Sequence, residues 1–207
     1  MKLDARSIGL VIAGAILAIA TVWIHYEVKA KLAPVAGLGL GLDGMSGGYS
    51  KFEIGDQIPD FKSSTLHGGS IALSDFRDQQ VVVLDFWATW CTPCVKGMPA
   101  LQEMHEEFGG RGVKVLAVNV GEDAETVQEF IDREGYSFDV VMDPFDDIKD
   151  AFGVGGIPQL FIVDKSGHLQ FSKVGGAVSS AQAKAQANKL GALLEKLLQE
   201  VPTAASS

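Results

Sequence analysis

The sequence predicts an α/β fold in which a mixed central sheet is covered by helices on both faces. Apolar runs typical of strands buried on both faces alternate with helical patterns, and the chain closes with a strand hairpin and a helix. Its 207 residues are 47% hydrophobic and 21% charged, which suits one folded domain with appendages. The net charge of -9 repels phosphate backbones and argues against nucleic-acid binding.

The amino-terminal segment predicts a membrane anchor. Ile8 to Ile24 contains no charged residue, and with its neighbours it reaches the roughly 20 residues that cross a bilayer as a helix. Trp23 and Tyr26 fit an interfacial aromatic belt. We expect residues 1–32 to be a single uncleaved transmembrane anchor in the cytoplasmic (inner) membrane. A cleaved signal peptide is the alternative, but the following residues offer no convincing cleavage site.

The rest of the chain divides by composition. Residues 33–50 are rich in glycine and predict a flexible linker. Residues 51–200 carry the periodic patterns of a folded domain, and residues 201–207 predict a disordered tail. Because a short amino-terminal tail is the easier part to leave inside, the domain is expected in the periplasm or an equivalent extracytoplasmic space.

Hydrophobic periodicity and turn residues place the elements of the domain. The two strongest are apolar runs that predict buried strands at 79–87 and 113–120. In chain order, we expect an extended lead-in at 52–65, a turn at 66–69 and a return at 70–73, then the first buried strand, a helix at 91–108, the second buried strand, a helix at 124–135, a short strand at 137–143, a short helix at 145–153, a hairpin of strands 159–164 and 168–174, and a helix at 179–198.

The two cysteines, Cys91 and Cys94, form a C-x-x-C pair. Such a pair serves as a redox couple, as half of a metal site or as a structural staple. Zinc needs four ligands, and the four histidines do not have ligand spacing, so no metal site is predicted. A disulfide across three residues closes too small a loop to stabilise a fold much. The redox couple is favoured, and Cu(I) binding by the two soft thiolates stays open as an alternative.

Position explains the redox prediction. Cys91 follows a buried strand and begins a helix, where unpaired N–H groups and the helix dipole favour a thiolate. Cys94, one turn later, is placed to attack a mixed disulfide formed by Cys91. Pro93 fits the first turn of the helix, where no N–H is needed. Thr92, between the cysteines, is a candidate for tuning the redox potential.

Three further residues are candidates for the site. Asp85 follows an apolar run, and burial there would raise the pKa of its carboxyl. Such a group could accept the proton of Cys94. The alternative is that Asp85 lies on a solvated face of the sheet. Trp90 is expected to pack around the site. Pro158 precedes a strand, either as an ordinary edge residue or as a cis Ile157-Pro158 peptide that holds a backbone edge beside the thiols.

Together these motifs resemble the thioredoxin superfamily over residues 52–198. The segment "DFWATWCTPC" is similar to the thioredoxin active site and "GGIP" to its cis-proline loop. "GDQIPDF", "LSDF", "AVNVGED" and the added helix resemble the membrane-anchored TlpA/ResA-type branch. The resemblance implies a thioredoxin-like three-layer α/β/α fold.

The resemblance also assigns roles to the candidate residues. It makes Cys91 the attacking thiol, Cys94 the resolving thiol and Asp85 an aid to proton transfer, with Ile157 and Pro158 shaping the substrate groove. Glu122 matches an acidic residue near the active site of ResA-type proteins; a solvated carboxylate at a helix start is equally consistent. Gly97 departs from the pattern, because ResA-like members commonly carry an acid there.

The predicted function is a membrane-tethered thiol:disulfide oxidoreductase that reduces disulfides of extracytoplasmic client proteins. It needs no cofactor beyond its own redox-active disulfide, and a membrane thiol reductase is the implied electron donor. A role in cytochrome c maturation is a weaker implication of the resemblance. An oxidase that introduces disulfides is the second alternative beside copper handling. Peroxidase activity is disfavoured, because Thr89 and Pro93 lack the spacing of the peroxiredoxin motif.

Overall fold

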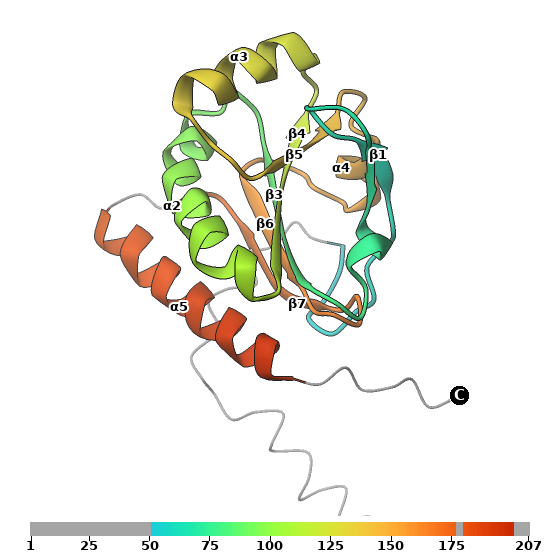
Figure 1. Cartoon of the computed structure of the whole chain (residues 1–207), viewed down its shortest axis with the longest axis vertical. Coiled ribbons are helices and arrows are strands. Elements are labelled where there is room, and N and C mark those ends of the chain that lie inside the picture. The colour runs from blue at the N-terminus through green and yellow to red at the C-terminus, as the bar shows by residue number, and fades with distance from the viewer. Residues whose placement is uncertain (1–50, 177–179, 201–207) are drawn as a thin grey trace, which may run out of the picture. The chain divides into compact units, whose positions relative to one another are not determined.

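The computed structural model describes residues 51–176 and 180–200 (Figure 1). The predicted anchor (1–32), linker (33–50) and tail (201–207) lie outside these residues. Within the described ranges, none of the helices combines the length and the apolar character that a bilayer crossing requires.

The domain opens with a small hairpin, as the sequence predicts. Strands β1 (Lys62–Ser64) and β2 (Ser70–Ala72) pair antiparallel, and the turn between them places Gly68 and Gly69 at positive φ. Glycine takes this conformation without the steric cost that a side chain brings. The 3₁₀ helix η2 (Leu73–Phe76) follows the hairpin, and a bridge from Thr65 to Val141 connects the hairpin to the main sheet.

The central sheet has five strands in the order β5-β4-β3-β6-β7. The middle strand, β3, pairs parallel with β4 and antiparallel with β6, so the sheet is mixed as predicted. β4 pairs parallel with β5, and β6 pairs antiparallel with β7. The strands are β3 (Val81–Trp87), β4 (Val113–Val120), β5 (Asp139–Asp143), β6 (Gln159–Val163) and β7 (Leu169–Val174).

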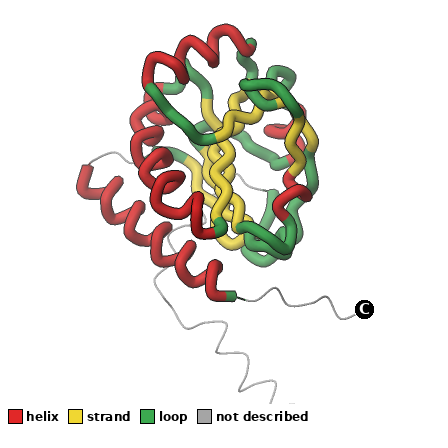
Figure 2. The backbone as a smooth tube through the Cα atoms, in the orientation of Figure 1, coloured by secondary structure: helices red, strands yellow, loops and turns green. Residues whose placement is uncertain are grey.

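Helices cover both faces of this sheet, which gives the predicted three-layer α/β/α arrangement (Figures 1 and 2). α2 and α5 lie on one face, while α4 and the β1–β2 hairpin lie on the other. The α-helices are α2 (Thr92–Phe108), α3 (Ala124–Glu134), α4 (Asp147–Ala151) and α5 (Ser180–Gln199), and the 3₁₀ helix η3 (Gly109–Arg111) extends α2.

Alternation along β3 divides the core into two parts. Leu84 and Phe86 point to the face covered by α4, where Phe86 contacts the rings of Phe152 and Phe161. On the other face Trp87 packs against Phe130 of α3. Full burial of one such side chain contributes about 2–3 kcal/mol by area. β3 is therefore fixed from both sides, and the loop that follows it starts from a rigid strand end.

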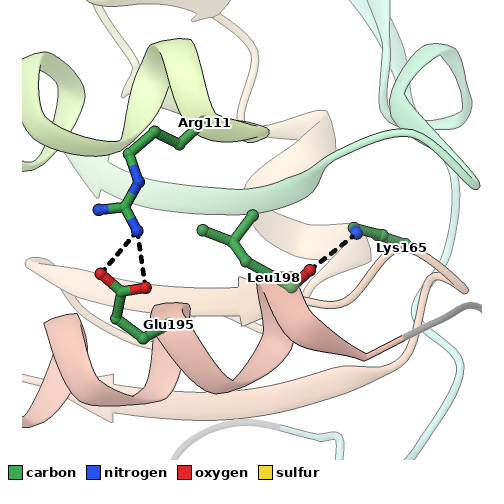
Figure 3. Close-up of polar contacts among 4 residues, drawn as sticks. All are labelled: Arg111, Lys165, Glu195 and Leu198. Carbon is green, nitrogen blue, oxygen red and sulfur yellow. Dashed lines mark hydrogen bonds and ion pairs between the residues drawn. The ribbon is translucent and has the colours of Figure 1, made fainter.

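Helix α5 is held in place by an apolar stripe and by several polar contacts. Leu190, Leu194 and Leu197 are buried, as the leucine spacing predicts, and Leu193 and Leu198 are partly buried. Figure 3 shows two of these contacts: Arg111 Nη2 donates to both carboxylate oxygens of Glu195, and the Lys165 ammonium donates to the Leu198 carbonyl. The sheet face beneath α5 is thereby closed at this end.

Candidate active site

The active-site loop connects the end of β3 to the start of α2. Cys91 is the N-cap residue of α2, and its Sγ accepts a hydrogen bond from the Cys94 N–H at 3.3 Å. Its own carbonyl accepts from the Val95 N–H at 3.0 Å, which closes the first helical turn. Pro93 occupies the first turn, where its missing N–H costs nothing. The sequence therefore places one sulfur at the positive end of a helix dipole, where a thiolate is stabilised.

The two thiols are joined as a disulfide in this structure. Cys91 is 4% exposed and Cys94 is 2% exposed, so of the two Cys91 is nearer the surface. A disulfide at a helix N-cap, rather than between distant elements, crosslinks little of the fold.

The cis-proline loop lies beside this pair. The Ile157-Pro158 peptide is cis, so of the two alternatives left open by the sequence the cis peptide is confirmed. Pro158, Pro93 and Cys94 line one cavity. Gly176, after β7, lies so close to the helix start that a Cβ there would be 3.2 Å from the Pro93 carbonyl oxygen. Three separate segments of the chain thus meet at the thiols.

The cavity behind the disulfide has a volume of about 110 Å³. It lies between the sheet and helices α2 and α5. Its lining is mostly apolar, and its polar side chains are Asp85, Lys173 and Gln186. Gly97 also lines it, and a Cβ at that position would meet nothing within 4 Å, so the missing acid leaves open space here.

Asp85 occupies the inner wall of this cavity. By surface area its side chain is half-buried, because one side faces the cavity, but protein surrounds the rest of it. Desolvation by burial raises the pKa of its carboxyl from 3.8 to about 7. A group that gains and loses a proton near neutral pH is suited to general acid–base work. The alternative of a solvated sheet face is wrong.

Glu122 contacts the active-site loop directly. One carboxylate oxygen accepts from the Thr89 N–H at 2.7 Å and from Asn119 Nδ2 at 2.8 Å, and the other accepts from the Thr89 hydroxyl. Asn119 is fully buried at the end of β4. Glu122 is therefore more than a solvated carboxylate, since it joins the end of β4 to the loop two residues before Cys91.

We expect Glu122→Ala to lower the free energy of unfolding by about 1.5–3 kcal/mol, because charge-assisted hydrogen bonds are lost and the Thr89 N–H is left without its acceptor. Urea unfolding of the oxidised protein measures this. The matched control is Glu129→Ala, since Glu129 is exposed on α3. Its expected change stays within about 0.5 kcal/mol. Equal effects of the two substitutions would contradict a specific role for the Glu122 contacts.

Trp90 corrects one expectation. Its side chain is 69% exposed, so the prediction that it packs around the site is wrong. The reason is its place in the loop, where the chain has left β3 and the residue before the helix cap points outward. Thr92 is exposed as well, on the first turn of α2. Trp90 offers a large apolar surface to an incoming partner instead.

The described residues contain no candidate metal site. Among residues 51–176 and 180–200, no three or more His, Cys, Asp or Glu side chains gather closely enough to hold an ion.

Comparison with known proteins places the chain in a family. Residues 54–172 match the family model described as the AhpC/TSA family. The chain belongs to the AhpC/TSA family. This match includes the active-site loop, both cysteines and the cis-proline loop, so it covers every part of the site described above except Gly176, Lys173 and Gln186.

Curated relatives and solved structures agree with this assignment. Over 117 residues the chain is 41% identical to the thiol-disulfide oxidoreductase ResA of Geobacillus thermodenitrificans and 40% identical to that of Geobacillus kaustophilus, covering 56% of this chain and 67% of each relative. A Chlorobium tepidum structure described as a thiol:disulfide interchange protein, DsbE, is 31% identical with a TM-score of 0.63, covering 70% of this chain and 99% of that one. The fold is thioredoxin-like, as the resemblance implied.

Family, relatives and the Cys91–Cys94 pair together identify the chain as a thiol:disulfide oxidoreductase. Sequence reasoning missed three residues that line the cavity, Lys173, Gly176 and Gln186. Lys173 lies at the cavity because of the register in which β6 and β7 pair, and a single sequence does not reveal that register. Gly176 had a weak signal, since it follows Gly175 a few residues before the predicted helix at 179–198.

Proposed function

We propose that this protein reduces disulfide bonds of client proteins outside the cytoplasm, held at the membrane by its amino-terminal segment. The observation that carries the proposal is the Cys91–Cys94 couple at the N-terminus of α2, beside a cis-proline loop and an exposed tryptophan. Thr92 and Pro93, rather than a histidine, lie between the cysteines. No positive side chain between them therefore adds to the stability of the thiolate form, which favours a reductant.

The proposed reaction transfers two electrons from the thiol pair to the client. The Cys91 thiolate attacks one sulfur of the client disulfide, and the other client sulfur leaves as a thiolate and takes a proton. Cys94 then loses its proton to Asp85 and attacks Cys91 Sγ. The mixed disulfide breaks, the Cys91–Cys94 bond forms, and the second client thiolate leaves and is protonated. Client disulfide and protein dithiol become client dithiol and protein disulfide.

The surface around the pair supports a protein client. Trp90 is exposed, and Ile157 and Pro158 are half-exposed beside the thiols. An extended segment that carries a disulfide can lie across the cis-proline loop with an apolar side chain against the indole. Positioning of this kind gives the attacking sulfur a high effective concentration of its target.

The remaining partners follow from the proposed location. An apolar run without charges at Ile8 to Ile24 supports the membrane tether. The oxidised pair then needs a reductant on the same side of the membrane, and a membrane thiol reductase is the class that fits. Delivery of reduced thiols for cytochrome c maturation is one use consistent with this arrangement.

A redox titration of the Cys91–Cys94 pair in glutathione buffers tests the direction of the reaction. We expect a midpoint potential below about -200 mV, because reductants of protein disulfides fall in that range. The thiol state is read by alkylation and mass spectrometry. A midpoint near about -120 mV would contradict the proposal and favour an oxidase.

Three parallel assays separate the other candidate activities. We expect the reduced protein to speed the reduction of insulin disulfides, to retain no Cu(I) after dialysis, and to consume hydrogen peroxide no faster than free cysteine. Stoichiometric copper retention without insulin reduction would instead favour copper handling. Rapid peroxide turnover would favour a peroxidase.

A further inference from the structure

Lys173 shares the cavity behind the disulfide with Asp85 and Cys94. It lies on β7, two strands away from Asp85, and its side chain is half-buried. Leu160 is the direct partner of Asp85 in the β3–β6 pair and of Lys173 in the β6–β7 pair. Direct partners in a sheet project to the same face, so both ionisable side chains point into the space beneath α2 and α5.

The charges around this space can be named element by element. β3 contributes Asp85, α2 contributes Cys94, and β7 contributes Lys173. β6 and α5 contribute Leu160 and Gln186, which do not titrate, and Ala117 is the partner of Asp85 on β4. Among the described lining residues, Lys173 is therefore the sole cation.

In the disulfide form the Lys173 ammonium is hydrogen-bonded to helix α5. Its Nζ donates to Gln186 Oε1 of α5, and burial alone lowers its pKa and raises that of Asp85. Adjacent strands lie about 4.8 Å apart, so the Cα atoms of Asp85 and Lys173 are about 10 Å apart across Leu160. The flexible lysine stem can shorten the distance between the two charges.

We propose that Lys173 is a positioning residue for the resolving step, supplying the positive charge that makes ionisation of Cys94 possible inside the cavity. Before that step Asp85 is a carboxylate and Cys94 a thiol; after it the carboxyl is protonated and Cys94 is a thiolate. One negative charge stays in an apolar space throughout. A buried anion is costly unless a counter-charge is near, and Lys173 is the cationic side chain among the residues that line this cavity.

The proposed role of Lys173 depends on thiol–disulfide exchange at the Cys91–Cys94 pair and not on whether the pair reduces or oxidises its client. It can therefore be tested without a client protein. Reduced protein reacts with Ellman's reagent in two phases. Cys91 attack releases the first thionitrobenzoate, and Cys94 attack on the resulting mixed disulfide releases the second. The rate of the second phase against pH therefore reports the titration of the coupled Asp85–Cys94 pair, from which the attacking Cys94 thiolate is formed.

We expect Lys173→Met to move the midpoint of the second-phase profile upward by about one pH unit, from the Coulomb term over about 10 Å at an effective dielectric constant of about 20. At neutral pH this slows the second phase by about tenfold. The first phase, which reports Cys91, keeps its midpoint. Lys173→Arg is expected to restore the profile, because it keeps the charge.

A matched control is Lys165→Met. Lys165 is also half-buried on the β6–β7 hairpin and also bonds to α5, through the Leu198 carbonyl, but it does not line the cavity (Figure 3). Its profile should superpose on that of the unsubstituted protein. Lys173→Gln, which keeps a donor for Gln186, is a second neutral variant in case Lys173→Met fails to fold.

The charge mechanism is overturned by either of two results. In the first, the neutral variants lose stability but keep the pH profile of the second phase. Lys173 would then have only a structural role, as the residue that bonds β7 to α5. In the second, Lys173→Arg moves the profile as far as Lys173→Met. An absence of insulin reduction, by contrast, would count against the proposed function and leave this test intact.

Discussion

Cys91→Ser is expected to abolish disulfide exchange, whereas Cys94→Ser is expected to stop at a stable mixed disulfide. Cys91 is the helix N-cap and, at 4% against 2%, the slightly more exposed of two buried cysteines, so we expect a client disulfide to react with it first. Cys94 is only 2% exposed and lies one turn into the helix, so we expect it to react poorly with a client when Cys91 is replaced. We expect turnover of insulin disulfides to fall by at least about 10³-fold in both variants, since neither can complete the cycle.

The two variants differ in what they accumulate. Incubated with an oxidised client and resolved without reductant, Cys94→Ser should yield a covalent adduct that dithiothreitol dissolves, and Cys91→Ser should yield almost none. The adduct mass then names the client when the trap is isolated from its native membrane. Equal adduct formation by both variants would contradict the assignment of Cys91 as the attacking thiol.

Most elements of the fold could be predicted because their patterns are strong and local. The strand predicted at 79–87 is apolar from Val81 to Trp87 except at Asp85, as a strand buried on both faces requires, and β3 begins two residues later than predicted, at Val81. The helix predicted from Cys91 to Phe108 begins one residue later, because Cys91 caps it rather than joins it. The hairpins at β1–β2 and β6–β7 were marked by glycine turns.

Only those features of the site that depend on residues adjacent in the sequence could be predicted. The two cysteines and their helix position follow from a few adjacent residues. The isomer of Ile157-Pro158 does not, since both forms of an X-Pro bond are accessible and tertiary contacts select one. The exposure of Trp90 was missed because an aromatic residue near a buried strand usually packs. Lys173 depends on a register across three strands, which local periodicity does not encode.

Asp85→Asn is expected to stabilise the oxidised protein at pH 8 and to leave its stability almost unchanged near pH 4. Burial raises the pKa of Asp85 from 3.8 to about 7, so the folded state binds this proton more tightly than the unfolded state. Its contribution to stability is full below pH 3.8 and is lost as pH rises through about 7. Above that pH the folded protein holds a buried carboxylate, which the amide removes.

We expect the free energy of unfolding to rise by about 2–4 kcal/mol at pH 8, less than the full linkage value, because one side of the carboxyl faces the cavity and not packed protein. Urea unfolding at pH 4 and pH 8 measures this change in the free energy of unfolding. Asp132→Asn is the matched control, since Asp132 is exposed on α3, and its effect should stay within about 0.5 kcal/mol at both. A variant that is destabilised at pH 8 would show that the charged form of Asp85 is the one the fold prefers.

The same substitution separates stability from catalysis. Without a proton acceptor beside Cys94, the second phase of the reaction with Ellman's reagent should slow by about 10²-fold at pH 7, while the first phase keeps its rate. The deficit should shrink above pH 9, where solvent base takes the proton instead. A more stable protein that resolves its mixed disulfide more slowly is the result expected if the buried carboxyl is retained for proton transfer. Unchanged second-phase kinetics at pH 7 would mean that Cys94 loses its proton by another route.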